Sequence, residues 1–422
     1  MDKKYMDFFD LAHRNLLFNI QITEKVTKSI SSSILDGKME SKEYADNTFY
    51  IIHADYCDKT VEVKSNYLNE TVISLLKEKG EYLDNEKIEI LTDISKNNTL
   101  SNSVILNIDQ DIEENIKLFQ LLDVNWKLDT NIELEYSTIR IVNDLGVDII
   151  SSTVVKSFSA SLSALQNGKL KYRSLHVLAG IGEDICYENH IRGLIDEVQL
   201  GSSEQEITSG KYKVLFKNTI MNTILNKLPS FINQKIVDNK TSFLEGKLDS
   251  KIFSDKVTII EDPLSEKSVG YRIFDDEGTS TQYKEIVKDG VLKTYLVDQK
   301  TASQDHIFAT GNYYGGISTR NMYLKSGDSS FSELVKKLDN GIIINERISQ
   351  LSITSNDPSL SFQAYGLLVK NGKIVGGVKP VIVTTSYLDL FNHVCEIGND
   401  FLIDNVSAHS PSMIVEDIDI AV

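Results

Sequence analysis

The beginning of the chain carries apolar residues at roughly helical spacing. Phe8, Leu11 and Ile20 belong to this pattern, and the run reaches Asp36-Gly37, a pair typical of a helix end. The spacing therefore predicts one or two amphipathic helices over Met6–Leu35.

The next segments change from one periodicity to the other. β-branched and aromatic residues alternate with polar ones over Thr48–Val63 and again over Lys87–Leu91, which predicts strands. Helical spacing returns over Ile73–Lys79 and over Asp111–Leu122. Together these segments predict a first block of mixed α/β structure.

From Asn131 the pattern becomes strongly β, with a turn at Asn143–Gly146. It predicts a meander of half-buried antiparallel strands. A short polar stretch, 201–210, then marks the expected domain boundary. We therefore expect an α+β fold with an N-terminal α/β domain over residues 1–200 that ends in the meander. A large, mainly antiparallel β domain should follow over residues 201–422.

The segment after this boundary is expected to be helical. Lys213–Leu228 alternates briefly and then takes helical spacing, and Pro229 should end or kink that helix. A second helix is predicted over Ser230–Val237.

Two dipeptides predict hairpins in the C-terminal part. Asp289-Gly290 and Asn371-Gly372 each separate two apolar runs, and these residue types accept the positive φ angles of type I′ turns. Each pair of runs should form an antiparallel ribbon. The runs are Tyr283–Val287 with Val291–Val297, and Gly366–Val369 with Ile374–Val383.

Charge and composition exclude whole classes of function. The 422 residues include 44 Lys and Arg against 61 Asp and Glu, a net charge of −17, so the chain repels phosphate and anionic lipid. No run approaches the ~18 apolar residues of a membrane span. Three separated cysteines, Cys57, Cys186 and Cys395, do not form a disulfide framework. We expect a soluble, cytoplasmic protein with reduced thiols that binds neither nucleic acid nor membrane.

Local motifs for metal or covalent chemistry are absent from the sequence. No two of the seven histidines lie within ten residues of each other, and there is no HExxH, GxSxG or phosphate-binding loop. His393 and Cys395 would share one face of a strand, with Glu396 beside them. Two donors without a third favour ordinary packing over a metal site.

Three polar segments remain as candidates. The triplet Asp275-Asp276-Glu277 could serve acid/base chemistry or a hard cation, although Asp-Asp-Glu-Gly also favours a turn. Gly311–Gly316 is glycine-rich in a β context, which favours a turn or a close approach of another backbone. Arg320, followed by Asn321, could bind a carboxylate or a peptide carbonyl, with a surface ion pair as the more common alternative.

The order of several segments is more informative than any one of them. From about residue 130 to the end, the chain resembles the TldD/PmbA family of peptide-processing proteins. The segments that carry the resemblance are Ser137–Asn143, Phe274–Gln282, Lys288–Leu292, Tyr295–Asp298, Ala309–Asn312, Ile397–Asp400 and Ser410–Met413.

The resemblance also indicates a branch of that family. In the TldD branch, a helix after the domain boundary carries HExxxH, and a cysteine near the C-terminus completes a zinc site. Here the three motif positions fall near Asn226, Lys227 and Phe231, and 405–410 offers no thiolate. The chain is thus more similar to TldE (PmbA), the metal-free partner of TldD. No catalytic residue, metal ligand or cofactor is expected in it, and zinc is expected in the TldD-like partner.

One departure from the TldE pattern stands out. Relatives carry Gly-Asp-aromatic-Ser-Arg-Gly where this chain has Pro358–Gln363, which retains only the serine. We interpret this segment as an altered loop and assign no binding role to it.

The resemblance implies that this chain forms one half of a proteolytic chamber, and that the chamber admits unfolded peptide. The expected partners are a TldD-like metallopeptidase subunit and the peptide, and the isolated chain could form a homodimer. An independent hydrolase using His393, Cys395 and His409, and a peptide-binding scaffold without a protease partner, stay open as alternatives. The candidates for the substrate channel or subunit interface are Asp276, Glu277, Thr281, Gly311, Asn312, Gly315, Arg320 and Asn321.

Overall fold

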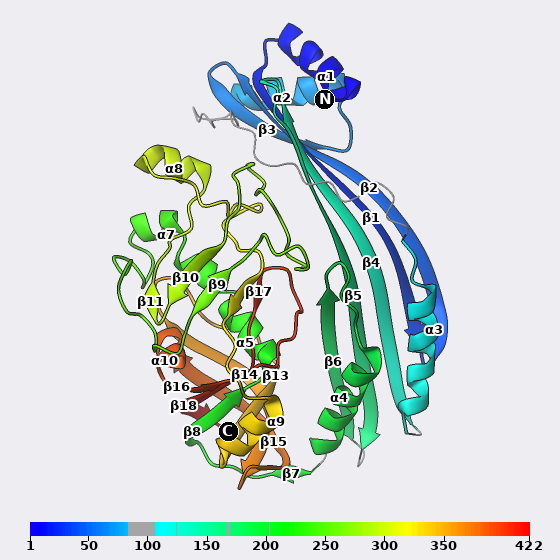
Figure 1. The fold of residues 1–422 in the computed structure, drawn as a ribbon, viewed down its shortest axis with the longest axis vertical. Helices are drawn as coiled ribbons and strands as arrows, with labels where there is room; N and C mark the ends of the chain where they lie inside the picture. The colour runs from blue at the N-terminus through cyan, green and yellow to red at the C-terminus, as the bar shows by residue number, and fades with distance from the viewer. Residues whose placement is uncertain (83–105, 124, 167–168, 202) are drawn as a thin grey trace.

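The computed structural model describes residues 1–82, 106–123, 125–166, 169–201 and 203–422. Within these residues the strands form three sheets of six, five and seven strands. Figure 1 shows a long arched sheet standing beside a compact C-terminal half, with helix α3 on the outer side of the arch.

The arched sheet is antiparallel throughout, in the order β3-β2-β1-β4-β5-β6. Its long hairpins carry alternating residues, so one face of each strand can be apolar and the other polar. The strands are β1 (Phe18–Leu35), β2 (Lys38–Tyr56), β3 (Lys59–Ser65), β4 (Trp126–Asn143), β5 (Asp148–Gln166) and β6 (Lys169–Ala179).

Helices cover the apolar face of this sheet in two groups. One group packs on Ile22 and Ile52 near one end, and the other packs on Ile132 and Phe158 near the other end. The helices are α1 (Lys3–Arg14), α2 (Glu70–Tyr82), α3 (Asp109–Leu118), the 3₁₀ turn η1 (Phe119–Leu121) and α4 (Tyr187–Leu200).

The predicted helical run over Met6–Leu35 is wrong beyond its first third. The chain is helical only in α1 and then forms β1, which pairs with both β2 and β4. Ile20, Ile22 and Ile30 lie an even number of residues apart, so they also fit the two-residue period of a strand. Asp36-Gly37 has positive φ angles of 47° and 75° and forms a hairpin turn, not a helix end.

Other predictions for this part are confirmed. Strands occupy most of Thr48–Val63, and β4 and β5 form the meander around the turn at Asn143–Gly146. Helix α2 covers the first predicted helical run, and α3 with η1 covers the second as far as Leu121. The predicted strand Lys87–Leu91 lies outside the described residues.

The C-terminal half contains the other two sheets. The five-stranded sheet has the order β11-β10-β9-β12-β17, and the seven-stranded sheet has the order β16-β18-β8-β13-β14-β15-β7. Their strands are β7 (Glu204–Gln205), β8 (Gly210–Phe216), β9 (Ile259–Glu261), β10 (Lys284–Lys288), β11 (Val291–Leu292), β12 (Met322–Leu324), β13 (Gly341–Arg347), β14 (Ser359–Lys370), β15 (Lys373–Ser386), β16 (Val394–Ile397), β17 (Ala408–His409) and β18 (Met413–Ala421).

Short helices connect these strands. The predicted pair around Pro229 is present, although the second helix is divided in two. Pro229 stands in the first turn of its helix, where its missing N–H costs nothing. The helices are α5 (Asn218–Leu225), α6 (Leu228–Phe231), α7 (Gln234–Asp238), α8 (Gln299–Asp305), α9 (Phe331–Leu338) and α10 (Tyr387–Asn392).

Both predicted hairpins are confirmed. Asp289-Gly290 joins β10 to β11 with φ angles of 47° and 78°, and Asn371-Gly372 joins β14 to β15 with 51° and 68°. The strand after the first turn is shorter than predicted, since it ends at Leu292.

The interpretation of Pro358–Gln363 as a loop is wrong. Residues Ser359–Gln363 begin β14 and pair with β15, because Leu360 and Phe362 alternate into the core of the C-terminal half. The residues that differ from the pattern of the relatives therefore lie in a strand and not in a loop.

The seven-stranded sheet is buried on both faces. Ile342 and Ile344 of β13 point into the main core, while Ile343 packs on the opposite side against α9. A smaller cluster joins the two parts of the molecule, because Phe274 packs against Ile139 and Ile141 of the arched sheet. The predicted α+β class with mainly antiparallel sheets is confirmed. The boundary near residue 200 stays a prediction.

Candidate functional site

A buried carboxylate, Glu261, organises the polar interior of the C-terminal half. It ends β9 and is fully buried, and its oxygens accept from the Asn312 side chain at 2.8 and 3.0 Å and from the Arg320 backbone N–H at 2.9 Å. The Lys284 ammonium lies 3.0 Å from Glu261 Oε2. We call Glu261, Lys284 and Asn312 the interior cluster; it fixes β9, β10 and the glycine-rich loop together.

Sequence reasoning missed Glu261. The sequence feature that could have identified it is an acidic residue at the end of the apolar run Val257–Ile260, because a charge is buried there only if it is paired. The partners Lys284 and Asn312 are distant in sequence, so no local motif marked the group.

The acidic triplet does not act as one site. Asp275 is fully buried and accepts backbone N–H groups of Glu277, Thr279 and Tyr313 at 2.9–3.0 Å. Burial raises its pKa to about 7, although these three bonds oppose the shift. The side chain therefore shapes the turn, as the Asp-Asp-Glu-Gly pattern indicated.

Asp276 and Glu277 have opposite environments. Asp276 accepts from Lys25 of β1 at 2.8 Å and from Arg272 at 3.0 Å. Burial opposes ionisation of Asp276, but the two cations outweigh it and hold its pKa below the usual range. Burial raises the pKa of Glu277 to about 7, and Asp275 adds to this effect. Asp276 thus links the two halves of the molecule, whereas Glu277 binds the backbone N–H of Gln299.

The glycine-rich segment is a turn with a close backbone approach, as predicted. A Cβ on Gly311 would stand 2.6 Å from the Ser280 carbonyl oxygen, and its φ is +71°. Gly315, by contrast, faces open space.

The structure brings most of the predicted channel residues into one region but buries three of them, Thr281, Gly311 and Asn312. Asn312 is 0% and Thr281 5% exposed, so both are packing groups of the interior. The Asn321 amide donates to the Asp262 carbonyl oxygen at 2.8 Å, and this residue also lines a cavity. A channel role for the whole set stays a prediction.

Three cavities lie in a row between the arched sheet and the C-terminal half, and we call them together the junction groove. Their volumes are about 210, 430 and 590 Å³. The first two share Ser268, and the second and third share His190, Phe401 and Leu402. The three cavities are therefore neighbours, and residues of β5, β6 and α4 line them on one side.

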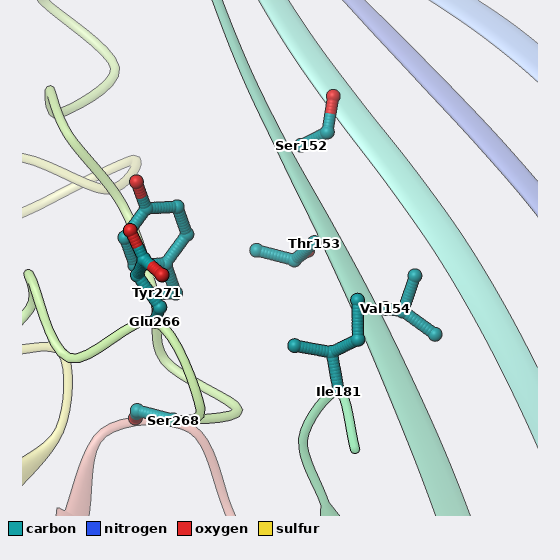
Figure 2. A pocket seen from close by; sticks show the side chains of 7 residues that line it. All are labelled: Ser152, Thr153, Val154, Ile181, Glu266, Ser268 and Tyr271. Carbon is teal, nitrogen blue, oxygen red and sulfur yellow. The ribbon is translucent and has the colours of Figure 1, made fainter. Parts of the chain in front are cut away.

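The first cavity shows how the sheet faces the groove. In Figure 2 the side chain of Thr153 extends from β5 toward Tyr271 and Glu266, while Val154 points away from them. Cross-strand partners share a face of a sheet. The row that faces the C-terminal half therefore includes Thr153, Ser137 and Thr27, and the next polar rows add Ser31, Glu133, Ser157, Ser159 and His176.

The third cavity is lined by charges of both signs. Arg173 of β6 lies 2.8 Å from Glu346 of β13, and Lys217 contacts Glu197 of α4. Asn345 is 5% exposed, and among the residues that the structure describes neither its amide nitrogen nor its oxygen has a hydrogen-bond partner. Burial lowers the pKa of His190, and Lys217 adds to this effect, so the imidazole is neutral at pH 7. Such a surface can satisfy both donors and acceptors of a polar ligand.

The groove also adjoins the edge strand β6 of the arched sheet. The Leu178 N–H of β6 donates to the Ile403 carbonyl oxygen at 2.7 Å, on the side away from β5. This one backbone hydrogen bond reaches the edge of β6 from the loop at Ile403, and residues 173–176 of β6 line the third cavity.

The three residues considered for an independent hydrolase do not form one site: the Cys395 thiol contacts the His393 backbone carbonyl oxygen at 3.7 Å, and His409 lies in another sheet. His393 and Cys395 adjoin β16 in the seven-stranded sheet, whereas His409 is in β17 of the five-stranded sheet. His409 is 3% exposed, and burial lowers its pKa to about 4. Burial and Glu416 raise the pKa of the Cys395 thiol to about 11, so it is a poor nucleophile.

The positions equivalent to the HExxxH motif do not fit zinc. Asn226 caps the end of α5, and Lys227 precedes α6. Phe231 is 2% exposed and packs edge-on against Tyr387 with ring centroids 5.0 Å apart. In the part of the chain that the structure describes, no three His, Cys, Asp or Glu side chains are grouped as metal ligands.

Comparisons with known proteins identify relatives of this chain. The family model of the PmbA/TldA metallopeptidase C-terminal domain matches residues 209–422, half of the chain. The chain belongs to the PmbA/TldD family. It is 28% identical to a metalloprotease PmbA homolog of Buchnera aphidicola over 62% of each chain. It is 28% identical to metalloprotease PmbA of Escherichia coli O157:H7 over 47% of this chain and 43% of that protein. These alignments span less than two thirds of the relatives' length.

Solved structures extend the likeness to both halves. A Thermotoga maritima protein described as a proposed modulator of a DNA gyrase is 26% identical, with a TM-score of 0.86 over 99% of both chains. TldE from Thermococcus kodakarensis has a TM-score of 0.83 over 99% of this chain and 100% of its own, at 15% identity. The second match concerns the fold alone.

Among the described helices, none combines the length and the apolar character that a membrane crossing requires.

Proposed function

We propose that this chain is the metal-free, TldE-type subunit of a heteromeric peptidase whose TldD-like subunit carries the zinc, and that it binds unfolded peptide in the junction groove. The observation that carries the proposal is the row of adjoining cavities between the two halves, with charges of both signs and the edge strand β6 in its lining. Family membership and relatives named metalloproteases support the peptide as the substrate class.

The groove suits an extended peptide and not a folded domain. Main-chain hydrogen bonds to a strand edge bind a peptide irrespective of its side chains. Ser and Thr hydroxyls on the sheet face can each donate and accept, so they suit a variable sequence. The chain's own residues then bind and orient the peptide, and bond cleavage is the task of the partner subunit.

The residue types at the motif positions support the division of labour. Asn226, Lys227 and Phe231 supply neither an imidazole nor a thiolate, the zinc ligands of the TldD branch. No catalytic step is therefore assigned to this chain.

Co-expression with the TldD-like protein of the same organism tests the proposal. We expect one complex on size-exclusion chromatography, zinc bound in the complex, and cleavage of an unfolded peptide by the complex but not by either chain alone. The lone chain serves as the control for metal content. Stoichiometric zinc together with turnover in the lone chain would contradict the proposal, and so would a failure of the two chains to associate.

A further inference from the structure

A β-bulge places Asn345 in the lining of the third cavity. The pairing of β13 with β14 shifts its register between Ile344 and Glu346, so Asn345 has no cross-strand partner in β14. On its other side, β13 pairs with β8 only as far as Ile344. A bulge leaves one residue of a strand unpaired and turns its side chain in a new direction. Asn345 thus departs from the alternation of β13 and lines the cavity while it is 5% exposed.

A second buried asparagine lines the same cavity and has its hydrogen bonds satisfied. The Asn218 nitrogen donates to the Asp400 carbonyl oxygen at 2.7 Å, and its oxygen accepts the Thr219 N–H at 2.8 Å. Within the described residues, neither polar atom of the Asn345 side chain has such a partner. The cavity therefore contains one amide that the fold uses and one that it leaves available.

The chemistry of the Asn345 side chain indicates what it can bind. A buried amide without partners lowers the stability of a fold, so its presence requires a reason. A carboxamide carries N–H donors and a C=O acceptor side by side. A residue in an extended chain also presents its N–H and C=O on one edge, and paired residues of antiparallel strands exchange both bonds. The Asn345 carboxamide can therefore take the place of one strand residue and bind an extended main chain at two points.

Another wall of the cavity is the edge strand β6. Its Leu178 N–H donates to the Ile403 carbonyl oxygen and therefore points away from β5. The pairing of β6 with β5 has no register shift, and main-chain groups in such a ladder alternate between the two sides of the strand. Ser174 and His176 hence direct their N–H and C=O groups away from β5 as well, and both residues line the third cavity.

The ion pair between Arg173 and Glu346 shows that β6 and β13 approach each other at this cavity. The two side chains lie 2.8 Å apart, and they belong to the residues next to Ser174 and Asn345. A peptide strand along β6 would direct every second residue toward β6 and the residues between them toward the other side. One of these intervening residues can then meet Asn345.

We propose that the Asn345 carboxamide binds the main-chain N–H and C=O of one residue of an extended peptide in the third cavity. The proposal rests on the proposed function, since it takes peptide as the ligand of the junction groove. It adds that recognition at this point depends on the main chain and not on a side chain. The bound residue can therefore be of any type except proline, which has no N–H.

Calorimetric titration of the full chain tests the proposal with three N-acetylated peptide amides. The first alternates Ala and Ser, the second replaces each Ala by lactic acid and so has esters at alternate positions, and the third carries one internal Gln in place of a Ser. We expect Asn345→Ala and Asn345→Leu to weaken binding of the first and third peptides about fivefold or more. The loss should be smaller for the second peptide, because it can keep its amides toward β6 and turn its esters toward Asn345.

Cleavage by the assembly with the TldD-like partner provides a second measurement. The same two variants should raise KM for the first peptide and leave kcat nearly unchanged, because this chain supplies no catalytic group.

The two variants and a control exclude a merely structural effect. Asn345→Ala leaves space at the site and Asn345→Leu fills it, and the unfolding midpoints of both should stay close to that of the wild type. Asn239→Leu is the matched control, because Asn239 is an exposed asparagine at the end of α7 and lines none of the three cavities of the groove. Its peptide affinities should equal those of the wild type.

The outcomes separate this inference from the proposed function. Unchanged affinity for the first peptide in both Asn345 variants contradicts the role of Asn345 and leaves peptide binding intact. A loss confined to the Gln peptide also contradicts it, because Asn345 would then bind a side-chain amide. Equal losses for the amide and ester peptides would show a purely structural role. Neither binding nor cleavage of any of the peptides, by the chain or by the assembly, contradicts both proposals.

Discussion

The interior cluster and the junction groove treat buried polar groups differently. Around Glu261, both carboxylate oxygens are used by Asn312, Lys284 and a backbone N–H. In the junction groove, the Asn345 amide lacks a partner on both polar atoms among the described residues, whereas the Asn312 amide of the interior cluster lacks one only on its oxygen. The comparison teaches that a charged neighbour fixes a buried amide, because the Asn312 nitrogen donates to Glu261 while the Asn345 amide has no partner among the described residues.

The physical reason for the difference is packing. The interior joins strands of one sheet, whose register brings the partners of Glu261 within reach. The groove lies between two separately built halves, joined by the Phe274 cluster and by ion pairs such as Lys25 with Asp276. Surfaces that meet in this way leave space, and polar groups at that space remain able to bind a ligand.

The largest effect should come from breaking the interior cluster. Glu261→Gln leaves the Lys284 ammonium buried without a counter-ion, and we expect a loss of about 3–5 kcal/mol in the free energy of unfolding by urea. Glu285→Gln is the matched control, because Glu285 makes a more exposed pair with Lys288 and should cost less than about 1 kcal/mol. Equal losses of unfolding free energy in the two variants would contradict the larger contribution expected of the buried pair.

Unfolding free energies measured over a range of pH should test the raised pKa of Glu277 in the acidic triplet. The pKa of Glu277 is raised to about 7 in the folded chain, so its ionisation costs stability as the pH rises from about 4.5 to about 7. Glu277→Gln keeps the acceptor for the Gln299 N–H and should be more stable than the wild type by about 2 kcal/mol at pH 8. At pH 4 the two should be equal. A difference in unfolding free energy that does not change with pH would contradict the raised pKa.

The ion pair across the junction should have a smaller effect. Lys25→Met removes one of the two cations on Asp276, and Arg272 still neutralises the carboxylate. We expect a loss of about 1 kcal/mol in chemical unfolding, against about 0–0.5 kcal/mol for Lys28→Met, whose partner Asp46 is exposed. An equal loss of unfolding free energy in Lys28→Met and Lys25→Met would mean that the ion pair between Lys25 and Asp276 stabilises the protein no more than an exposed pair does.

The smallest effect is expected at Asn345. Its amide has no partner within the described parts of the chain, so Asn345→Ala should change the free energy of unfolding by less than about 0.5 kcal/mol. Asn312→Ala, which removes a donor to Glu261, provides the comparison and should cost about 1–3 kcal/mol. A loss at Asn345 as large as that at Asn312 would mean that its amide is satisfied in the folded protein.

The sequence by itself determined the features that depend on neighbouring residues. Asp289-Gly290 and Asn371-Gly372 dictated their turns because few residues accept two successive positive φ angles. Alternation identified the meander of β4 and β5, and the close approach at Gly311 followed from glycine in a β context. The ordered segments also indicated the family that the comparisons establish.

Tertiary structure decided whatever depends on partners far along the chain. The stretch Phe18–Leu35 fits either a helix or a strand by its spacing, and pairing with β2 and β4 made it a strand. Glu261 became the centre of the interior only because Lys284 and Asn312 fold onto it. The junction groove exists because two halves meet, and no local pattern records which polar groups such a meeting leaves unpaired.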